Sequence, residues 1–224
     1  MTVNANPYIV TSGLVLNLDA GNPRSYGGSG TTWKDVSNSG TTASLVNGPT
    51  YTSGTSGYFT FDGTDDYGQT AIAVLPSSAT SAMSLEAVCL TTDTSLAYQT
   101  VLGTQGIYTQ IGFSTSNFAG GRNGGGGGTL YTGLTSISAN TWYHMVLSFD
   151  GTNGRFYLND SLIYTGSIGS NGSTNGVNLL STYAANTAAE RLKGRIALAR
   201  VYNISLSADQ VSQNFNAIRG RYGI

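Results

Sequence analysis

The chain alternates between hydrophobic and polar positions in short stretches that are separated by turn-forming residues. The clearest stretch is 142–158, where Met145, Leu147 and Phe149 alternate with the residues between them. A period of two is typical of a β-strand, whose successive side chains point to opposite faces of a sheet. Residues 150–154, with two glycines, an aspartate and an asparagine, then supply a turn, after which the alternation resumes. We therefore predict a β-hairpin here.

Similar short patterns recur along the chain between dense turn signals, and together they predict two antiparallel sheets packed face to face. The further predicted strands cover residues 14–18, 58–61, 83–90, 100–102, 108–113 and 195–202. The residues expected in the core of this sandwich are Leu16, Phe61, Leu85, Met145, Leu147, Phe156 and Leu198.

One short helix is predicted near the end of the chain. Ser207 and Gln210 have the spacing of a capping box, in which each side chain bonds the other residue's backbone amide. Val211 and Ile218 then recur at the spacing of one helical face. We expect a helix over about 207–219 that lies against the sandwich.

The composition fits a single domain with a polar but nearly uncharged surface. The chain has 224 residues, of which we assign 1–12 to an N-terminal arm and 13–224 to one β-sandwich domain. Charged residues make up 9%, against about 25% in an average soluble domain. The net charge is −1 and no basic run is interleaved with aromatics, which disfavours nucleic acid. No apolar run reaches membrane-spanning length, and the single cysteine excludes an intrachain disulfide.

The basic residues are concentrated near the C-terminus. Six of the ten lie within residues 191–221. One interpretation is ordinary solvated charge along a strand and a helix. The other is a basic face that docks onto an acidic partner, for which Arg195, Arg200 and Arg219 are the candidate residues.

An acidic stretch at 61–67 is the best candidate for metal chemistry. Asp62, Asp65 and Asp66 place three carboxylates within five residues, and hard oxygen ligands of this kind suit calcium. The spacing differs from an EF-hand loop, and aspartate and glycine are also what a tight strand connection requires. A turn without any cofactor and a calcium site are thus the two interpretations.

Catalytic residues are scarce. The only glutamates, Glu86 and Glu190, are far apart in sequence, whereas retaining glycosidases hold two carboxyl groups about 5–5.5 Å apart. The sequence leaves open a pairing of Glu86 with Asp93 or Asp150 across strands. His144, the only histidine, lies in the middle of a predicted strand, where a packing role is expected. We therefore predict that the chain is not an enzyme.

Tyrosines and glycines raise two further alternatives. Five tyrosines fall near predicted turns or strand ends, where their rings are suited either to stacking on sugars or simply to forming strands. They are Tyr26, Tyr98, Tyr108, Tyr131 and Tyr183. The five consecutive glycines at 124–128 lack the lysine and helix of a phosphate-binding loop, which favours a surface loop.

Four stretches of the chain resemble the laminin G-like branch of the concanavalin A-like lectin/glucanase superfamily, over roughly residues 12–219. They are 13–21 with 32–35, then 61–67, then 142–159, and finally 194–202 with 206–211. The resemblance implies an all-β, two-sheet antiparallel jelly-roll sandwich. A stand-alone domain that opens with the sequence at 19–23 also resembles virion proteins of tailed phages.

This resemblance implies a non-enzymatic virion structural protein, namely a capsid decoration or surface attachment module of a tailed phage. The alternative is a glycan-binding, lectin-like receptor-binding module of a tail fibre. The expected partners are capsid or other virion proteins, cell-surface glycans under the alternative, and further copies of the chain in a dimer or trimer. Residues 1–8 lack the features of a secretory signal, which fits synthesis in the host cytoplasm and a place on the virion surface.

Overall fold

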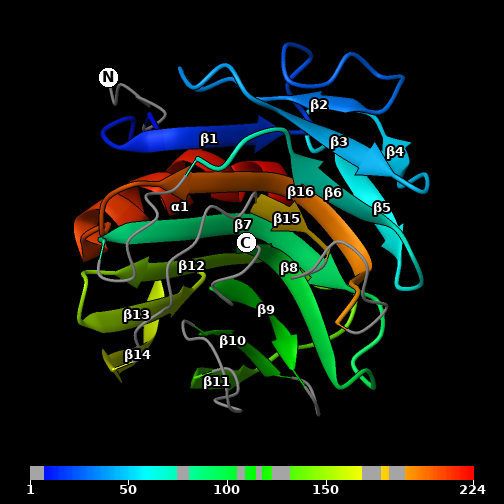
Figure 1. The fold of residues 1–224 in the computed structure, drawn as a ribbon. Coiled ribbons are helices and arrows are strands. Elements are labelled where there is room, and N and C mark those ends of the chain that lie inside the picture. The colour runs from blue at the N-terminus through cyan, green and yellow to red at the C-terminus, as the bar shows by residue number, and fades with distance from the viewer. Residues whose placement is uncertain are drawn as a thin grey trace, which may run out of the picture.

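In the residues that it describes, the computed structural model contains two eight-stranded antiparallel sheets and one helix. It describes residues 8–74, 81–104, 109–114, 118–122, 132–167, 178–181 and 190–224. Sheet A has the order β14-β13-β12-β7-β16-β5-β4, and β1 also pairs with β16. Sheet B has the order β11-β10-β9-β8-β15-β6-β3-β2. The expected two-sheet antiparallel sandwich is therefore confirmed (Figure 1).

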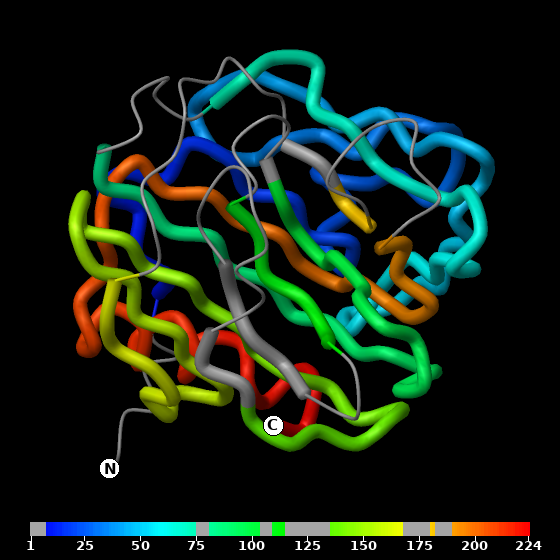
Figure 2. Tube along the Cα trace, turned by 60° about the horizontal axis from the view of Figure 1, so that its bottom comes forward, coloured from blue at the N-terminus to red at the C-terminus, as the bar shows by residue number. Residues whose placement is uncertain are grey.

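The strands of sheet A are β1 (Leu14–Asp19), β4 (Thr50–Thr52), β5 (Tyr58–Asp62), β7 (Met83–Thr91), β12 (Tyr143–Phe149), β13 (Asn153–Leu158), β14 (Ser161–Ser167) and β16 (Lys193–Tyr202). Those of sheet B are β2 (Thr32–Lys34), β3 (Thr42–Val46), β6 (Tyr67–Thr70), β8 (Tyr98–Thr104), β9 (Gln110–Ser114), β10 (Phe118–Arg122), β11 (Thr132–Ser136) and β15 (Asn178–Leu180). In Figure 2 the green strands β8 and β9 cross in front of the orange β16.

The main core lies between the two sheets. Six of the seven predicted core residues are buried there, namely Leu16, Phe61, Leu85, Met145, Leu147 and Phe156. Leu198 is also buried, but it belongs to a second cluster beneath the helix, with Val88 and Ile218. The pairing of β16 with β7 shifts register between Ile196 and Leu198, and such an irregularity changes the face to which the following side chains point. Leu198 is therefore a buried core residue, as predicted, but it lies on the helix side of sheet A and not between the two sheets.

The helix α1 (Ala208–Tyr222) covers part of the outer face of sheet A. Its predicted capping box between Ser207 and Gln210 is present. The helix continues three residues beyond the predicted end and stops at Gly223, which adopts a left-handed conformation with φ 69°. Glycine takes this conformation without strain, so it ends helices well. Within the described ranges, no helix combines the length and hydrophobicity needed to cross a membrane.

Residues 19–21, part of the first stretch that carries the family resemblance, contact the end of the helix. The two carboxylate oxygens of Asp19 accept hydrogen bonds from the Arg221 guanidinium, both at 2.8 Å. A side chain at Gly21 would collide with this guanidinium and with the carbonyl of Thr55, so only glycine fits. Residues 1–7 of the predicted arm lie outside the described residues, while Val10 is buried and its amide bonds Asn214 of the helix.

Candidate functional site

Sheet B turns a polar face away from the core. On β9, Ile111 and Phe113 are buried in the core, so the alternating residues Gln110 and Ser114 point outward. The registers of β8, β6 and β3 extend this face across the sheet. Among the described side chains, we name as the polar face Thr42, Ser44, Tyr67, Gln69, Tyr98, Thr100, Gln110 and Ser114. Thr100, Gln110 and Ser114 are buried, so only the other five offer surface to a ligand.

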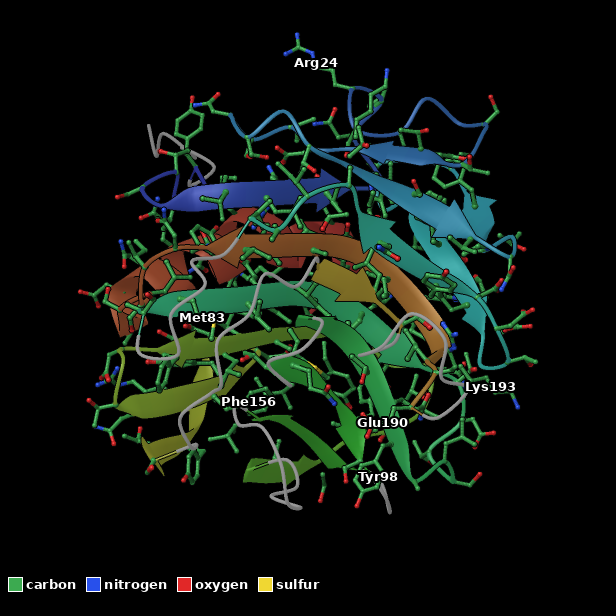
Figure 3. The ribbon with its side chains drawn as sticks, in the orientation of Figure 1. Arg24, Met83, Tyr98, Phe156, Glu190 and Lys193 are labelled. Carbon is green, nitrogen blue, oxygen red and sulfur yellow. The ribbon has the colours of Figure 1, made fainter. Side chains whose placement is uncertain are left out.

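Glu190 is fixed against the centre of this polar face. Its carboxylate oxygen Oε2 accepts hydrogen bonds from Gln110 Nε2 at 2.8 Å and from Thr100 Oγ1 at 3.3 Å, and its carbonyl accepts one from the Thr100 amide at 2.8 Å. Glu190 has a φ of 66°, which is uncommon for a residue with a side chain and persists only where the surroundings enforce it. Figure 3 shows Glu190 beside β8, near Tyr98. A carboxylate is thus held rigidly among neutral amides and hydroxyls.

Two aromatic rings complete the polar face. Tyr67 and Tyr98 are both half-buried, and the Arg191 guanidinium lies 4.7 Å from the centroid of the Tyr67 ring. Amides, hydroxyls and a carboxylate bind ligands rich in hydroxyl groups, while tyrosine rings contact their apolar faces. The arrangement therefore suits a neutral, polyhydroxylated ligand. Sequence reasoning missed Tyr67, although its alternation with the buried Gly68 and Thr70 signals an outward position.

The other predicted tyrosines differ in their position. Tyr98 lies on the polar face, as described above. Tyr26 is buried, with its ring 4.7 Å from those of Tyr51 and Phe59 and its hydroxyl donating to the Gly30 carbonyl. Burial, and to a smaller extent Tyr51, raises the pKa of Tyr26. Tyr26 therefore stabilises the core and is not available to a sugar. Tyr108, Tyr131 and Tyr183, together with the glycine run at 124–128, lie outside the described residues.

The three predicted metal ligands do come together. Asp62, Asp65 and Asp66 each offer a carboxylate oxygen, and these oxygens lie within 4.8 Å of one another. Asp62 Oδ1 accepts hydrogen bonds from the amides of Thr64 and Asp65, and Asp66 Oδ2 accepts one from the Asp62 amide. Gly63, at φ 79°, allows the sharp turn. These hydrogen bonds give the aspartates a structural role, because they stabilise the turn that connects β5 to β6.

Electrostatics also favours the turn interpretation. Burial, followed by the neighbouring charge of Asp62, raises the pKa of Asp66. Burial acts in the same direction on Asp62, but the backbone amides of Thr64, Asp65 and Asp66 outweigh it and lower its pKa. Buried Arg191 already brings positive charge to all three carboxylates. Calcium needs six to eight oxygen ligands, so a calcium site stays a prediction here.

Glu86 lies on the opposite side of the molecule, sealed beneath α1. It is fully buried, and its Oε1 accepts a hydrogen bond from Arg200 Nη1 at 2.9 Å and lies 3.0 Å from His144 Nε2. Its Oε2 accepts a hydrogen bond from Asn214 Nδ2 of the helix at 2.8 Å. Burial alone would raise the pKa of Glu86, but Arg200 and His144 lower it to about 2. This buried network attaches the helix to sheet A.

The contacts of this network bear on two predictions, the docking role of Arg200 and the possible partners of Glu86. Arg200 is only 3% exposed and is bonded to Glu86 and Asn17, so its predicted role in docking a partner was wrong. The sequence left open a pairing of Glu86 with Asp93 or Asp150, but Glu86 is fully buried and its polar contacts among the described residues are with Arg200, His144 and Asn214. Asp93 pairs with Lys193, and Asp150 pairs with Arg155. The two glutamates of the chain therefore lie on opposite faces of the sandwich.

The remaining docking candidates are on or near the surface. Arg219 is exposed in the last turn of α1. Arg195 is half-buried on β16, and its guanidinium lies 4.7 Å from the centroid of the Tyr58 ring. Neither arginine forms an ion pair within the part of the chain that the structure describes.

Comparisons with known proteins agree on the fold. The model of the family described as the concanavalin A-like lectin/glucanases superfamily matches residues 62–212. No curated protein sequence matches the chain. Among solved structures, domain 4 of AbnA, a GH43 extracellular arabinanase from Geobacillus stearothermophilus solved with arabinotriose, is 15% identical with a TM-score of 0.69. That match covers 91% of this chain and 98% of the domain.

Two larger proteins contain a similar unit. The binding domain of Paraclostridial Mosquitocidal Protein 1 is 15% identical with a TM-score of 0.69, and the match covers 92% of this chain and 52% of that one. Trypanosoma rangeli sialidase in complex with sialic acid is 14% identical with a TM-score of 0.69, over 93% of this chain and 33% of the sialidase. The chain thus spans about a third of the sialidase. At these identities the likeness shows the fold alone.

Proposed function

Because the chain belongs to the concanavalin A-like lectin/glucanase superfamily, we propose that it is a non-enzymatic glycan-binding module whose ligand lies on the polar face of sheet B. The observation that carries this proposal is the fixed Glu190 carboxylate, held by Thr100 and Gln110 among neutral groups. A preorganised acceptor binds hydroxyl groups at a lower entropic cost than a mobile one. Half-buried Tyr67 and Tyr98 add apolar surface beside it.

The positions of the two glutamates support binding without turnover. Glycosidic bond cleavage by an acid and a second carboxylate needs the two groups to flank the scissile bond, within about 10 Å of each other. Glu190 lies at the polar face of sheet B, whereas Glu86 is buried between sheet A and α1. Since Glu86 has no access to a ligand on the polar face, the pair cannot act together.

The similar fold of the arabinanase domain is consistent with the proposal, because that domain has the same size and was solved with arabinotriose. The setting that we propose for the module is the surface of a tailed-phage particle, where it binds host glycans. Support for this setting comes from the opening sequence at 19–23 and the low charge of the chain. Mass spectrometry of purified particles tests it, since the chain must be found on them.

A glycan array probed with the purified protein tests the binding proposal, followed by calorimetry with the best ligand. Replacing Gln69 and Tyr98 together by alanine should weaken binding at least tenfold, because it removes an amide and a ring from the polar face. The matched control is Gln213→Ala with Tyr8→Ala, the same two residue types at exposed positions beside the helix. An array without signal, or equal losses in both double variants, would contradict the proposal.

A further inference from the structure

The outer face of sheet A carries an aromatic and arginine-rich surface where the helix ends. The ring of Trp142 lies 5.3 Å from that of Tyr222 at the end of α1 and 5.6 Å from that of Tyr58 on β5, measured between centroids. Arg195 lies over Tyr58 at 4.7 Å. We call this surface, with the exposed Arg219 of the last helical turn, the aromatic–arginine patch. Its members Tyr58, Trp142 and Arg195 are half-buried and therefore still offer surface to a partner.

A shallow hollow adjoins the patch at the end of the helix. It has a volume of about 450 Å³, and its lining includes Ala217, Ile224 and the two arginines Arg219 and Arg221. Ala217 and Ile224 pack on the same buried cluster as Trp142, so the hollow and the patch are continuous. The hollow therefore combines the apolar side chains of Ala217 and Ile224 with the guanidinium groups of Arg219 and Arg221.

Two positive charges of this region are uncompensated. Arg221 is held by Asp19 through two hydrogen bonds, and Lys193 by Asp93. Arg195 and Arg219 have no carboxylate partner among the described residues, and Arg195 Nε is buried without a hydrogen bond there. Hydrogen bonds from a guanidinium group to a carboxylate are stronger than those between neutral groups, so a ligand that brings carboxylates to these two arginines is favoured. The missing acceptors point to carboxylates.

The geometry of the rings favours a protein over an acidic glycan. The ring of Trp142 is inclined by 60° to that of Tyr58 and by 49° to that of Tyr222. Guanidinium groups already lie over the rings of Tyr58 and Tyr222, from Arg195 and Arg221. Among the described rings of the patch, Trp142 is parallel to neither neighbour and two rings are already covered by guanidinium groups, which leaves little ring surface for a sugar. Tryptophan, tyrosine and arginine are instead the residue types that dominate protein interfaces.

We propose that the aromatic–arginine patch docks an acidic segment of a partner protein. Carboxylates of the segment pair with Arg195 and Arg219, and an apolar side chain of the segment enters the hollow against Ala217 and Ile224. The patch lies on the outer face of sheet A and the polar face on the far side of sheet B, so one molecule can bind both partners at once. This docking does not depend on the proposed glycan function.

The test uses a fluorescein-labelled peptide in which glutamate and aspartate alternate with leucine, and fluorescence anisotropy with the full chain. Wild type should bind it, more weakly as sodium chloride rises from 20 to 200 mM. Replacing Arg195 and Arg219 together by serine should weaken binding at least tenfold. Arg219→Glu alone should also weaken it, and this exposed position carries no risk of unfolding.

The matched control removes the same total charge elsewhere. Arg24→Ser with Lys34→Ser changes two exposed cations of the β1–β2 region, and Figure 3 shows Arg24 projecting away from the body of the protein. This variant should bind the peptide as wild type does. Equal losses in both double variants would show general charge attraction and overturn the proposal. A failure of the wild type to bind the peptide at 20 mM salt would also overturn it. So would a patch that binds polygalacturonate through Arg195 but does not bind the peptide, because the ligand would then be an acidic glycan.

Discussion

The buried charge of Glu86 should account for a large part of the stability of this fold. Glu86→Gln keeps the shape of the side chain but removes its negative charge, and it leaves Arg200, 3% exposed, without a counterion. Asn214 and His144 lose a charged acceptor at the same time. Because these contacts attach α1 to sheet A, the substitution acts on the whole outer layer of the sandwich.

The magnitude follows from the pKa of Glu86. Its pKa falls from the ordinary value of 4.5 to about 2 in the folded protein. A shift of this size corresponds to about 3 kcal/mol of stability at pH 7, close to the 3–5 kcal/mol typical of breaking a buried ion pair. Since the folded pKa is the lower one, this contribution is present above pH 4.5 and is lost as the pH falls toward 2. At pH 3 about 1 kcal/mol of it should remain.

Urea unfolding of wild type and Glu86→Gln at pH 7 and pH 3 measures both values. The control is Asp93→Asn. Hydrogen bonds from Ser95, together with Lys193, lower the pKa of Asp93 to about 2 as well, but this carboxylate is solvent-screened, so its loss should barely change stability. A Glu86→Gln variant as stable as wild type at pH 7, or a stability difference that does not shrink at pH 3, would refute the reasoning.

Three further predictions concern packing, the acidic turn and the cysteine. Leu147→Ala should lower the free energy of unfolding, measured with urea, by about 2–5 kcal/mol. Leu162→Ala, at a side chain 53% exposed, should change it by less than about 0.5 kcal/mol. Similar losses in the two variants would contradict their different burial. Asp66→Asn should preserve or raise the Tm at pH 7, because the raised pKa of Asp66 marks its charge as unfavourable, and the benefit should disappear below the ordinary aspartate pKa of 3.8. A Tm several degrees lower at pH 7 would contradict this. Burial raises the pKa of the Cys89 thiol far above its usual range, so a disulfide reagent should label it only as fast as the protein unfolds; rapid labelling in native buffer would argue against its position in the core.

Local signals in the sequence were sufficient for most of the secondary structure. The alternation at 142–158 predicted the hairpin that forms β12 and β13, with Leu147 opposite Phe156. The capping box at Ser207 located the start of α1 within one residue. Such patterns succeed because side-chain period and turn chemistry depend on neighbouring residues alone.

Features that depend on long-range register could not be predicted. Glu86 and Arg200 are 114 positions apart, and only the pairing of β7 with β16 places them opposite one another. Without that register, Arg200 looked like any surface arginine of a basic stretch. The bulge between Ile196 and Leu198 had no sequence signal either, and it moved Leu198 from the sandwich core to the helix layer.

The polar face was only partly predictable for the same reason. Tyr98 was among the candidate tyrosines, but Gln110, Thr100 and Glu190 meet only because β8, β9 and the segment before β16 converge. Glutamate is also an unusual choice at the positive φ of Glu190, so no turn pattern pointed to it.

The helix layer determines which chemistry each face of the sandwich can carry. By covering β7 and β16, α1 turns the outer face of sheet A into a second core, where Glu86 and Arg200 neutralise one another and, with the contact to His144, stabilise the fold. Sheet B carries no such helix within the described residues, so its hydroxyl and amide groups remain directed away from the core. Stability and ligand binding thus depend on different residues, and substitutions at the exposed or half-buried positions of the polar face, such as Gln69 and Tyr98, should change binding without lowering stability as Glu86→Gln does.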